Sequence, residues 1–211
     1  MKKKQKEKYL YTASEQALFR SLDSPSKVQD FLNSLKFNFE KKGETCYSPR
    51  QVMKYKTAHC MEGALFATAA LEFHGQRPLV VDLRSVKPGD DDHVVAVFKR
   101  FGCYGAISKT NHSVLRYREP VYKTLRELVM SYFHEYFLNT GQKTLREYSE
   151  IFDLNFFNNL NWRTSTEQLF IIPQKLDKIK HYKILNNQQI KNLRPAERIE
   201  IQAGKIIEYK R

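Results

Sequence analysis

The sequence predicts an α+β fold in which several helices precede a set of short strands. Two Ser-Pro helix starts and a long helix of small residues come before residue 76, and three apolar strand segments follow between residues 77 and 109. Grouped helices followed by grouped strands are typical of the α+β class. The 211 residues are 41% hydrophobic, which is enough for one domain with a packed core.

Three helices are expected in the first part of the chain. In "DSPSKVQDFLNSLKF", Ser24 is a favourable N-cap and Pro25 suits the first helical position. "YSPRQVMKY" repeats this Ser-Pro start at Ser48. The third helix is expected from about Thr57, its N-cap, to Phe73, with Gly75 ending it. Its many small residues let other backbone approach closely, so this helix belongs in the middle of the fold: Gly63, Ala64, Ala67, Ala69 and Ala70.

Strands are expected after this helix, because the apolar pattern changes. "RPLVVDLRSV", "DDDHVVAVFKR" and "FGCYGAISK" predict three strands, the last two joined by a tight turn at Phe101-Gly102. "EPVYKTLRELVMSYFHEYFL" predicts an amphipathic helix. Near the end, "EQLFIIP" predicts a strand, and "ERIEIQAGKIIEYKR" predicts a hairpin around Ala203-Gly204.

The expected organisation has three parts: a basic flexible tail over residues 1–8, a core over residues 9–148, and a C-terminal extension over residues 149–211 that packs on the core and ends in the hairpin. The net charge of +13 is concentrated at the two ends of the chain, in residues 1–8 and 174–211. We favour a solvated, solubilising surface for these ends. Weak nucleic-acid binding through them is the open alternative; the sequence gives no indication of the oligomeric state.

The expected location is the cytoplasm, without a membrane partner. No apolar run approaches the roughly 18 residues of a membrane-spanning helix, and the basic N-terminal segment is not followed by the apolar core of a signal peptide. The three cysteines are then expected to be reduced thiols. No Cys-x-x-Cys pair is present, so the sequence carries no standard zinc or redox motif.

Cys60 is the most informative residue, because it stands where the third helix begins. The positive end of a helix dipole favours a thiolate, and a histidine could take up and return its proton. His93, at the head of the second strand, is the expected partner. A third group should fix the imidazole, and Ser108 and Asn111 in "YGAISKTNH" are the candidates. The alternative is that Cys60 is a packed structural thiol.

The order of these segments resembles the transglutaminase-like superfamily, relatives of the papain-like cysteine peptidases. The resemblance covers about residues 49–111: Cys60 opening "EGALFATAALEFHGQRP", then "LVVDL", then "DHVVAVF", then "YGAISK". It implies a papain-like core in which a central cysteine-bearing helix packs on an antiparallel sheet. It also implies that Cys60 is the nucleophile and His93 the base of a cysteine hydrolase, peptidase or acyltransferase that acts on an amide-bearing protein or peptide and needs no cofactor.

The sequence departs from this family at the third position, where Ser108 stands in place of an aspartate. Asn111 is the alternative for this role. We expect His59, His112 and Arg116 to line the substrate site; His59 is ranked behind His93 as a base because adjacent helical residues do not face each other. A zinc site of Cys60, His93 and His112 is a minor alternative. The second functional hypothesis is a catalytically inactive module that binds a protein or nucleic acid.

Overall fold

The computed structural model describes residues 10–87 and 89–210, so the expected tail over residues 1–8 lies outside the described residues. None of the described helices has both the length and the apolarity needed to cross a membrane. The helices are α2 (Ala13–Ser21), α3 (Pro25–Ser34), α4 (Pro49–Tyr55), α5 (Cys60–Phe73), α6 (Leu125–Phe133), the 3-10 helix η1 (Leu154–Leu160), α7 (Ile171–Leu176), α8 (Asn187–Lys191) and α9 (Arg198–Gly204).

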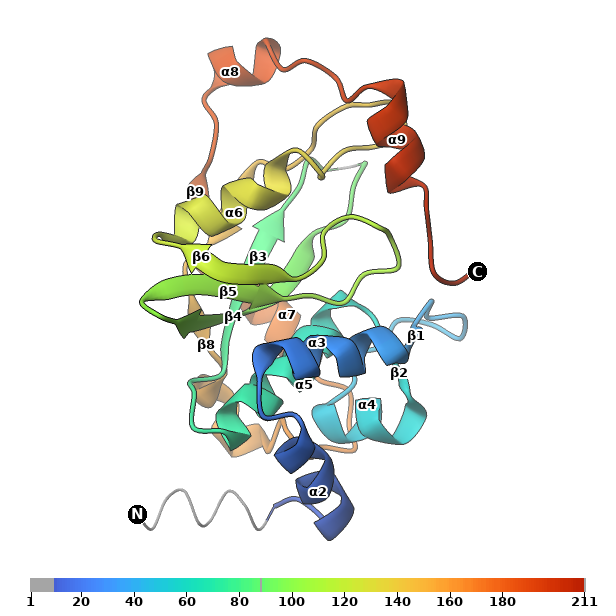
Figure 1. Ribbon diagram of the computed structural model, residues 1–211, viewed down its shortest axis with the longest axis vertical. Coiled ribbons are helices and arrows are strands. Elements are labelled where there is room, and N and C mark those ends of the chain that lie inside the picture. Colours follow the sequence, from blue (N-terminus) through green and yellow to red (C-terminus); the bar gives the residue numbers. More distant parts are fainter. Residues whose placement is uncertain (1–9, 88, 211) are drawn as a thin grey trace.

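An antiparallel sheet of seven strands runs through the molecule (Figure 1). Its order is β6-β5-β4-β3-β7-β9, and β8 also pairs with β3. A separate parallel pair, β1 (Lys36–Phe37) and β2 (Thr57–Ala58), leads into α5. The α+β class and the antiparallel sheet are therefore confirmed. The strands of the large sheet are β3 (Leu79–Arg84), β4 (His93–Arg100), β5 (Cys103–Ile107), β6 (Arg118–Tyr122), β7 (Glu147–Ser149), β8 (Phe152–Asp153) and β9 (His181–Lys183).

The two faces of the sheet carry two separate hydrophobic cores. Along β4, Val94 and Ala96 belong to the core around α5, whereas Val95 and Val97 belong to the core beneath α6. This alternation follows from the period of two along a strand. The run of apolar residues in β4 is continuous because both of its faces are covered, one by α5 and the other by α6.

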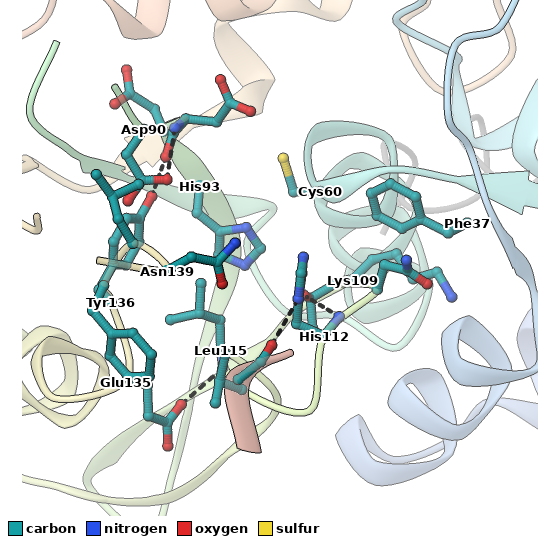
Figure 2. A pocket seen from close by; sticks show the side chains of 18 residues that line it. Phe37, Cys60, Asp90, His93, Lys109, His112, Leu115, Glu135, Tyr136 and Asn139 are labelled. Atoms are coloured by element: carbon teal, nitrogen blue, oxygen red, sulfur yellow. Dashed lines mark hydrogen bonds between the residues drawn. The ribbon is translucent and has the colours of Figure 1, made fainter. Parts of the chain in front are cut away.

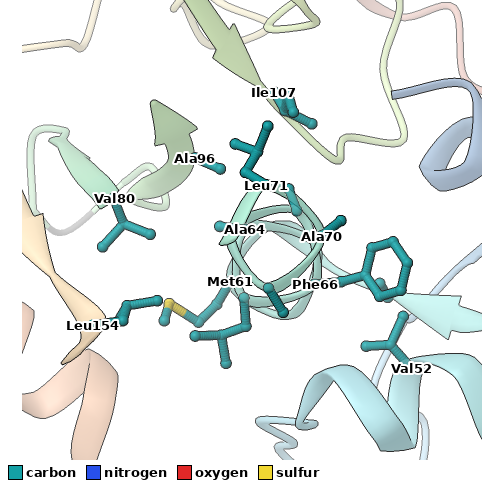
Figure 3. Close-up of a cluster of buried hydrophobic side chains, with 14 of the residues drawn as sticks. Val52, Met61, Ala64, Phe66, Ala70, Leu71, Val80, Ala96, Ile107 and Leu154 are labelled. Carbon is teal, nitrogen blue, oxygen red and sulfur yellow. The ribbon is translucent and has the colours of Figure 1, made fainter. Parts of the chain in front are cut away.

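Helix α5 lies at the centre of the first core (Figure 3). Apolar side chains surround it on every side, among them Val52 from α4, Val80 from β3 and Ile107 from β5. Its residues from Met61 to Leu71 are buried. The small side chains of α5 make this possible, because they let the strands and the neighbouring helices approach its backbone.

Lys109, just after β5, approaches α5 closely at Gly63. A Cβ atom added at Gly63 would lie 2.4 Å from the Cβ atom of Lys109. The Lys109 side chain is buried, and its Nζ donates hydrogen bonds to the carbonyl oxygens of Leu32 (2.9 Å) and Leu35 (2.7 Å) at the end of α3. Lys109 therefore ties the end of β5 to the last turn of α3 across the surface of α5.

Several expected boundaries are confirmed. Ser24 and Ser48 are the N-caps of α3 and α4, each followed by a proline at the first helical position. The turn between β4 and β5 is at Phe101 and Gly102, both with positive φ. Gly75 follows the end of α5 with a φ of 89°, a conformation that glycine adopts without strain.

Two expected elements near the C-terminus are wrong, because helices form where a strand and a hairpin were expected. "EQLFIIP" is not a strand: α7 covers Ile171–Leu176, and Pro173 lies in its first turn, where proline is tolerated. The terminal hairpin is wrong as well. Residues 198–204 form α9, because Glu197 and Glu200 make a capping box at its start. Residues 205–210 follow this helix and run beside residues 111–113.

We predict that Gly63→Ala destabilises the protein, because the new methyl group collides with the Cβ atom of Lys109. Overpacking of this kind costs about 1–3 kcal/mol. Urea unfolding at equilibrium would measure the change in the free energy of unfolding.

A double-mutant cycle identifies the source of this cost. Lys109→Ala keeps the Cβ atom, whereas Lys109→Gly removes it. The cost of Gly63→Ala should therefore persist in the Lys109→Ala background and shrink in the Lys109→Gly background. An equal cost in both backgrounds would show that the contact with Lys109 is not its cause.

Candidate active site

A cavity of about 360 Å³ opens where the start of α5, the start of β4 and the loops after β5 and α6 meet. Figure 2 shows the His93 ring in the middle of this cavity, with Cys60 to one side. Of the predicted site residues, Cys60, His93, Asn111 and His112 all line it. The other lining residues are Phe37, Asp90, Asp91, Asp92, Lys109, Thr110, Val114, Leu115, Glu135, Tyr136, Phe137, Leu138, Asn139 and Gly204.

Cys60 is the first residue of α5 and is partly exposed. The expectation that Thr57 caps this helix is wrong: Thr57 belongs to β2, and His59 is the N-cap. The change places Cys60 at the first helical position instead of the third. Its side chain therefore lies at the positive end of the helix dipole, which favours a thiolate.

A buried carboxylate stands behind the start of the helix. Glu62 is fully buried, and its oxygens accept hydrogen bonds from the Thr45 hydroxyl (2.7 Å), the Tyr47 backbone N–H (3.0 Å) and the Asn38 amide (3.0 and 3.2 Å). Glu62 also accepts from the backbone N–H of His59 (3.0 Å), as a capping box requires. These donors compensate for the burial of the charge.

His59 is held between this carboxylate and Cys60. Its Nε2 lies 3.0 Å from the carbonyl oxygen of Thr45 and 3.5 Å from a Glu62 oxygen. A carbonyl oxygen accepts hydrogen bonds, so Nε2 carries a proton. In the neutral ring Nδ1 accepts from the Met61 N–H at 3.3 Å. A hydrogen bond from Nδ1 to Cys60 instead requires a second ring proton, which makes His59 an imidazolium.

Both histidines stabilise the thiolate of Cys60. Burial alone raises the pKa of Cys60, but hydrogen bonds from His59 and His93 outweigh it and lower the pKa to about 5. Burial lowers the pKa of His59, but the hydrogen bond and charge of Cys60, with the charge of Glu62, raise it to about 9. Near neutral pH, Cys60 and His59 therefore form an ion pair. The ranking of His59 behind His93 rested on helical geometry, which does not apply because His59 lies before the helix.

His93 is held by Ser108, as the sequence predicted for one of its two candidates. His93 Nε2 lies 2.7 Å from Ser108 Oγ, and the Ser108 hydroxyl donates to the carbonyl oxygen of Leu115 at 2.6 Å. A hydroxyl has one proton, so Ser108 accepts from His93 and Nε2 carries the ring proton. The hydrogen-bond pattern thus places a proton on Nε2 and leaves Nδ1 of His93 as the nitrogen that can exchange a proton with Cys60.

Ser108 is itself clamped by Gln29 of α3. The Gln29 amide accepts from the Ser108 N–H (2.9 Å) and donates to the Ser108 carbonyl (2.8 Å), and both residues are buried. Sequence analysis missed Gln29, because a glutamine on a helix 79 residues away carries no recognisable signal. It also missed Glu62, although a glutamate three residues after an N-cap is the sequence signature of a capping box.

Asn111, the other candidate for the third position, is hydrogen-bonded to the C-terminal segment. Its amide donates to the Tyr209 carbonyl and accepts from the Tyr209 N–H, each at 2.9 Å. Arg116, expected to bind substrate, pairs with Glu208 at 2.9 Å. His112 bonds through Nδ1 to the carbonyl of Gly204. These residues therefore contact the C-terminal segment.

The other two cysteines differ from Cys60. Cys46 is buried, and burial raises the pKa of its thiol far above the ordinary value. Cys103 is partly exposed at the start of β5. All three cysteines are free thiols. Cys46 and Cys103 thus provide a buried and an accessible reference thiol within the same chain.

Within residues 10–87 and 89–210, one group of side chains could surround a metal ion. Oxygen atoms of Asp82, Asp92 and Asp177 all lie within 4.8 Å of one another. Asp82 is already hydrogen-bonded to His181 at 3.0 Å. The zinc alternative of Cys60, His93 and His112 does not form such a group among the described residues.

No protein-family model matches the chain, and no curated protein matches its sequence. The chemistry of the cavity therefore has to be inferred from its own residues.

We predict that Cys60 ionises with a midpoint near pH 5, because both histidines stabilise its thiolate. An ordinary cysteine ionises near pH 8.5. The ultraviolet absorbance of the thiolate, measured against pH as the difference between the native protein and Cys60→Ala, would give the midpoint. His59→Asn should raise it by removing one of the two donors. A midpoint near that of an ordinary thiol would contradict the ion pair.

Proposed function

We propose that the protein is a cysteine-dependent acyl-transfer enzyme that acts on an amide-bearing peptide or protein, with Cys60 as nucleophile and His93 as general base and acid. The observation that carries the proposal is the hydrogen bond of His93 Nε2 to Ser108, which leaves Nδ1 to exchange a proton with Cys60 in the cavity that both residues line. A cysteine-bearing helix packed on an antiparallel sheet supports the papain-like arrangement implied by the resemblance.

The first half of the reaction forms a thioester. The Cys60 sulfur attacks the amide carbonyl carbon while its proton resides on Nδ1 of His93. The backbone N–H groups in the first turn of α5, that of Cys60 among them, stabilise the negative charge on the carbonyl oxygen. The C–N bond then breaks, and the proton on His93 passes to the leaving amine.

The second half releases the acyl group. His93 takes a proton from water, the resulting hydroxide adds to the thioester carbonyl, and the C–S bond breaks to give a carboxylic acid and the Cys60 thiolate. An amine in place of water would give a new amide, which is transamidation. The same residues serve both outcomes, because only the attacking nucleophile differs.

Two histidines divide the work in this proposal. His59 supplies a positive charge beside the thiolate, and the buried carboxylate of Glu62 supports that charge. His93 moves protons, and Ser108 keeps its ring oriented. The serine adds no negative charge to His93, which suits a group that must release its proton to the leaving amine and take one up again from water.

The decisive experiment measures alkylation of Cys60 by iodoacetamide against pH, with each cysteine followed by peptide mass spectrometry. We expect Cys60 to react well below pH 7, and faster there than Cys103, the accessible reference. His93→Ala should slow alkylation of Cys60 at low pH and leave Cys103 unchanged.

The same experiment separates the two functional hypotheses. If Cys60 reacts no faster than Cys103 at any pH, the acyl-transfer proposal fails. The inactive binding module would then be the better interpretation of this fold.

We predict that Ser108→Ala slows acyl transfer by about 10- to 100-fold, which is the usual effect of removing an orienting group behind a reactive one. The hydrogen-bond acceptor of His93 Nε2 is lost in this variant, and the ring is free to rotate. Hydrolysis of a peptide thioester or activated ester would measure the change. Ser108→Thr, which retains a hydroxyl, should recover part of the rate, whereas equal losses in both variants would indicate a packing defect.

A further inference from the structure

The segment after α9 runs along the loop that joins β5 to β6. In Figure 1 the chain descends from α9 past this loop toward the C-terminal end. Two backbone hydrogen bonds join them: the Ser113 N–H donates to the Ile206 carbonyl, and the Glu208 N–H donates to the Asn111 carbonyl, each at 2.9 Å. His112 and Ile207 face each other between these bonds as an antiparallel bridge. Residues 205–210, the C-terminal strap, therefore pair with residues 111–113 as a strand would.

Side chains reinforce the pairing at the far end of the strap. The Asn111 amide makes both a donor and an acceptor bond with the backbone of Tyr209, which extends the ladder by one residue. Arg116 pairs with Glu208 at 2.9 Å, with about 30% of each side chain exposed. The ring of Tyr209 lies below the Lys109 ammonium at 5.8 Å. The strap thus presents an acidic residue followed by an aromatic one.

The strap lies against the active-site cavity at one end and a second cavity at the other. Gly204, immediately before the strap, lines the cavity of Cys60 and His93 together with Asn111 and His112. Tyr209 and Lys210 line a second cavity of about 520 Å³. Phe37 lines both cavities. A chain that follows this path therefore runs in a fixed direction between the cavity of Cys60 and the second cavity.

The strap is weakly held by apolar burial. The side chains of Ile206 and Ile207 are 62% and 42% exposed, and residues 205–208 are all exposed. Its attachment therefore depends on a few hydrogen bonds and one partly exposed ion pair. A segment with such contacts opens at a low free-energy cost compared with the core.

We propose that residues 111–113 form a strand-addition site for an extended peptide segment of the substrate, and that the C-terminal strap occupies this site as an internal stand-in. This inference rests on the proposed acyl-transfer function. Backbone pairing supplies affinity in such sites, and side-chain contacts supply specificity. The preferred peptide carries an acidic residue opposite Arg116 and an aromatic residue next to it, toward the second cavity.

The test uses full-length protein and the peptide Lys-Ile-Ile-Glu-Tyr-Lys, the sequence of residues 205–210. One version carries a chloroacetyl group at its N-terminus, and the other carries the same electrophile at its C-terminus. Because the strand-addition site fixes the direction of the bound peptide, one version should place its electrophile at Cys60 and alkylate it at least about 10-fold faster than the other. Equal rates for the two versions would overturn the inference.

Two substitutions in the strap provide a matched pair. Glu208→Pro removes the N–H that donates to Asn111 and the carboxylate that pairs with Arg116. Ile207→Pro alters a neighbouring position whose N–H makes neither of the two ladder bonds. Alkylation of Cys60 by the faster of the two peptides should rise several-fold in Glu208→Pro and much less in Ile207→Pro. If Glu208→Pro does not fold, Glu208→Lys replaces it, since it repels Arg116 and leaves the backbone intact.

Iodoacetamide separates the failure of this inference from failure of the proposed function. This small reagent needs no peptide site, so its rate at Cys60 should be the same in Glu208→Pro and the native protein. Fast reaction with iodoacetamide but no preference between the two peptides would overturn the strand-addition site alone. Slow reaction with iodoacetamide at every pH would overturn the acyl-transfer function. The strand-addition site would then be tested by binding, with fluorescence anisotropy of a labelled peptide that carries no electrophile. Equal affinity of this peptide for the native protein and for Glu208→Pro would overturn the strand-addition site.

Discussion

The close contact between helix α5 and the end of β5 is the constraint on which the rest of the structure depends. Gly63 and Lys109 touch so closely that a single added methyl group would not fit between them. The contact fixes how far α5 can slide along the sheet. Because Cys60 opens the helix and His93 opens the adjacent strand, it also fixes the separation between thiol and imidazole. The buried ammonium of Lys109 extends this constraint to α3, whose Gln29 holds Ser108.

The contacts that orient His59 and His93 involve backbone groups as much as side chains. Ser108 is held by Gln29 through its backbone, and its hydroxyl is directed by the carbonyl of Leu115. His59 is directed by the carbonyl of Thr45. A carbonyl oxygen accepts hydrogen bonds and does not change its protonation, so it fixes the direction of each proton. Groups that do not titrate thereby fix a proton on Nε2 of both histidines.

The sequence predicted much of the fold, because its strongest signals are local. Ser24-Pro25 and Ser48-Pro49 mark helix starts that need no tertiary information, and the continuous apolar run of β4 marks a strand covered on both faces. The pairing of His93 with Ser108 followed from strand order. The path of residues 205–210 could not be read in the same way, since isoleucine, glutamate and tyrosine suit an edge strand whatever its partner. Gln29 was missed for a related reason: only the folded structure brings α3 to the end of β5.

The position of the buried negative charge determines which of the two histidines is stabilised in its charged form. In the family that the sequence resembles, an aspartate stands behind the catalytic histidine, whereas here Ser108 occupies that place and adds no charge. The fully buried carboxylate of this site is Glu62, which lies behind His59 on the opposite side of Cys60. The histidine best placed to remain charged is therefore His59, and its charge stabilises the thiolate. Under the proposed function His93 then does not have to stabilise the thiolate alone, and a neutral serine is sufficient to orient it. One carboxylate, placed behind the other histidine, thus accounts for both the acidic thiol and the absence of an aspartate at the third position.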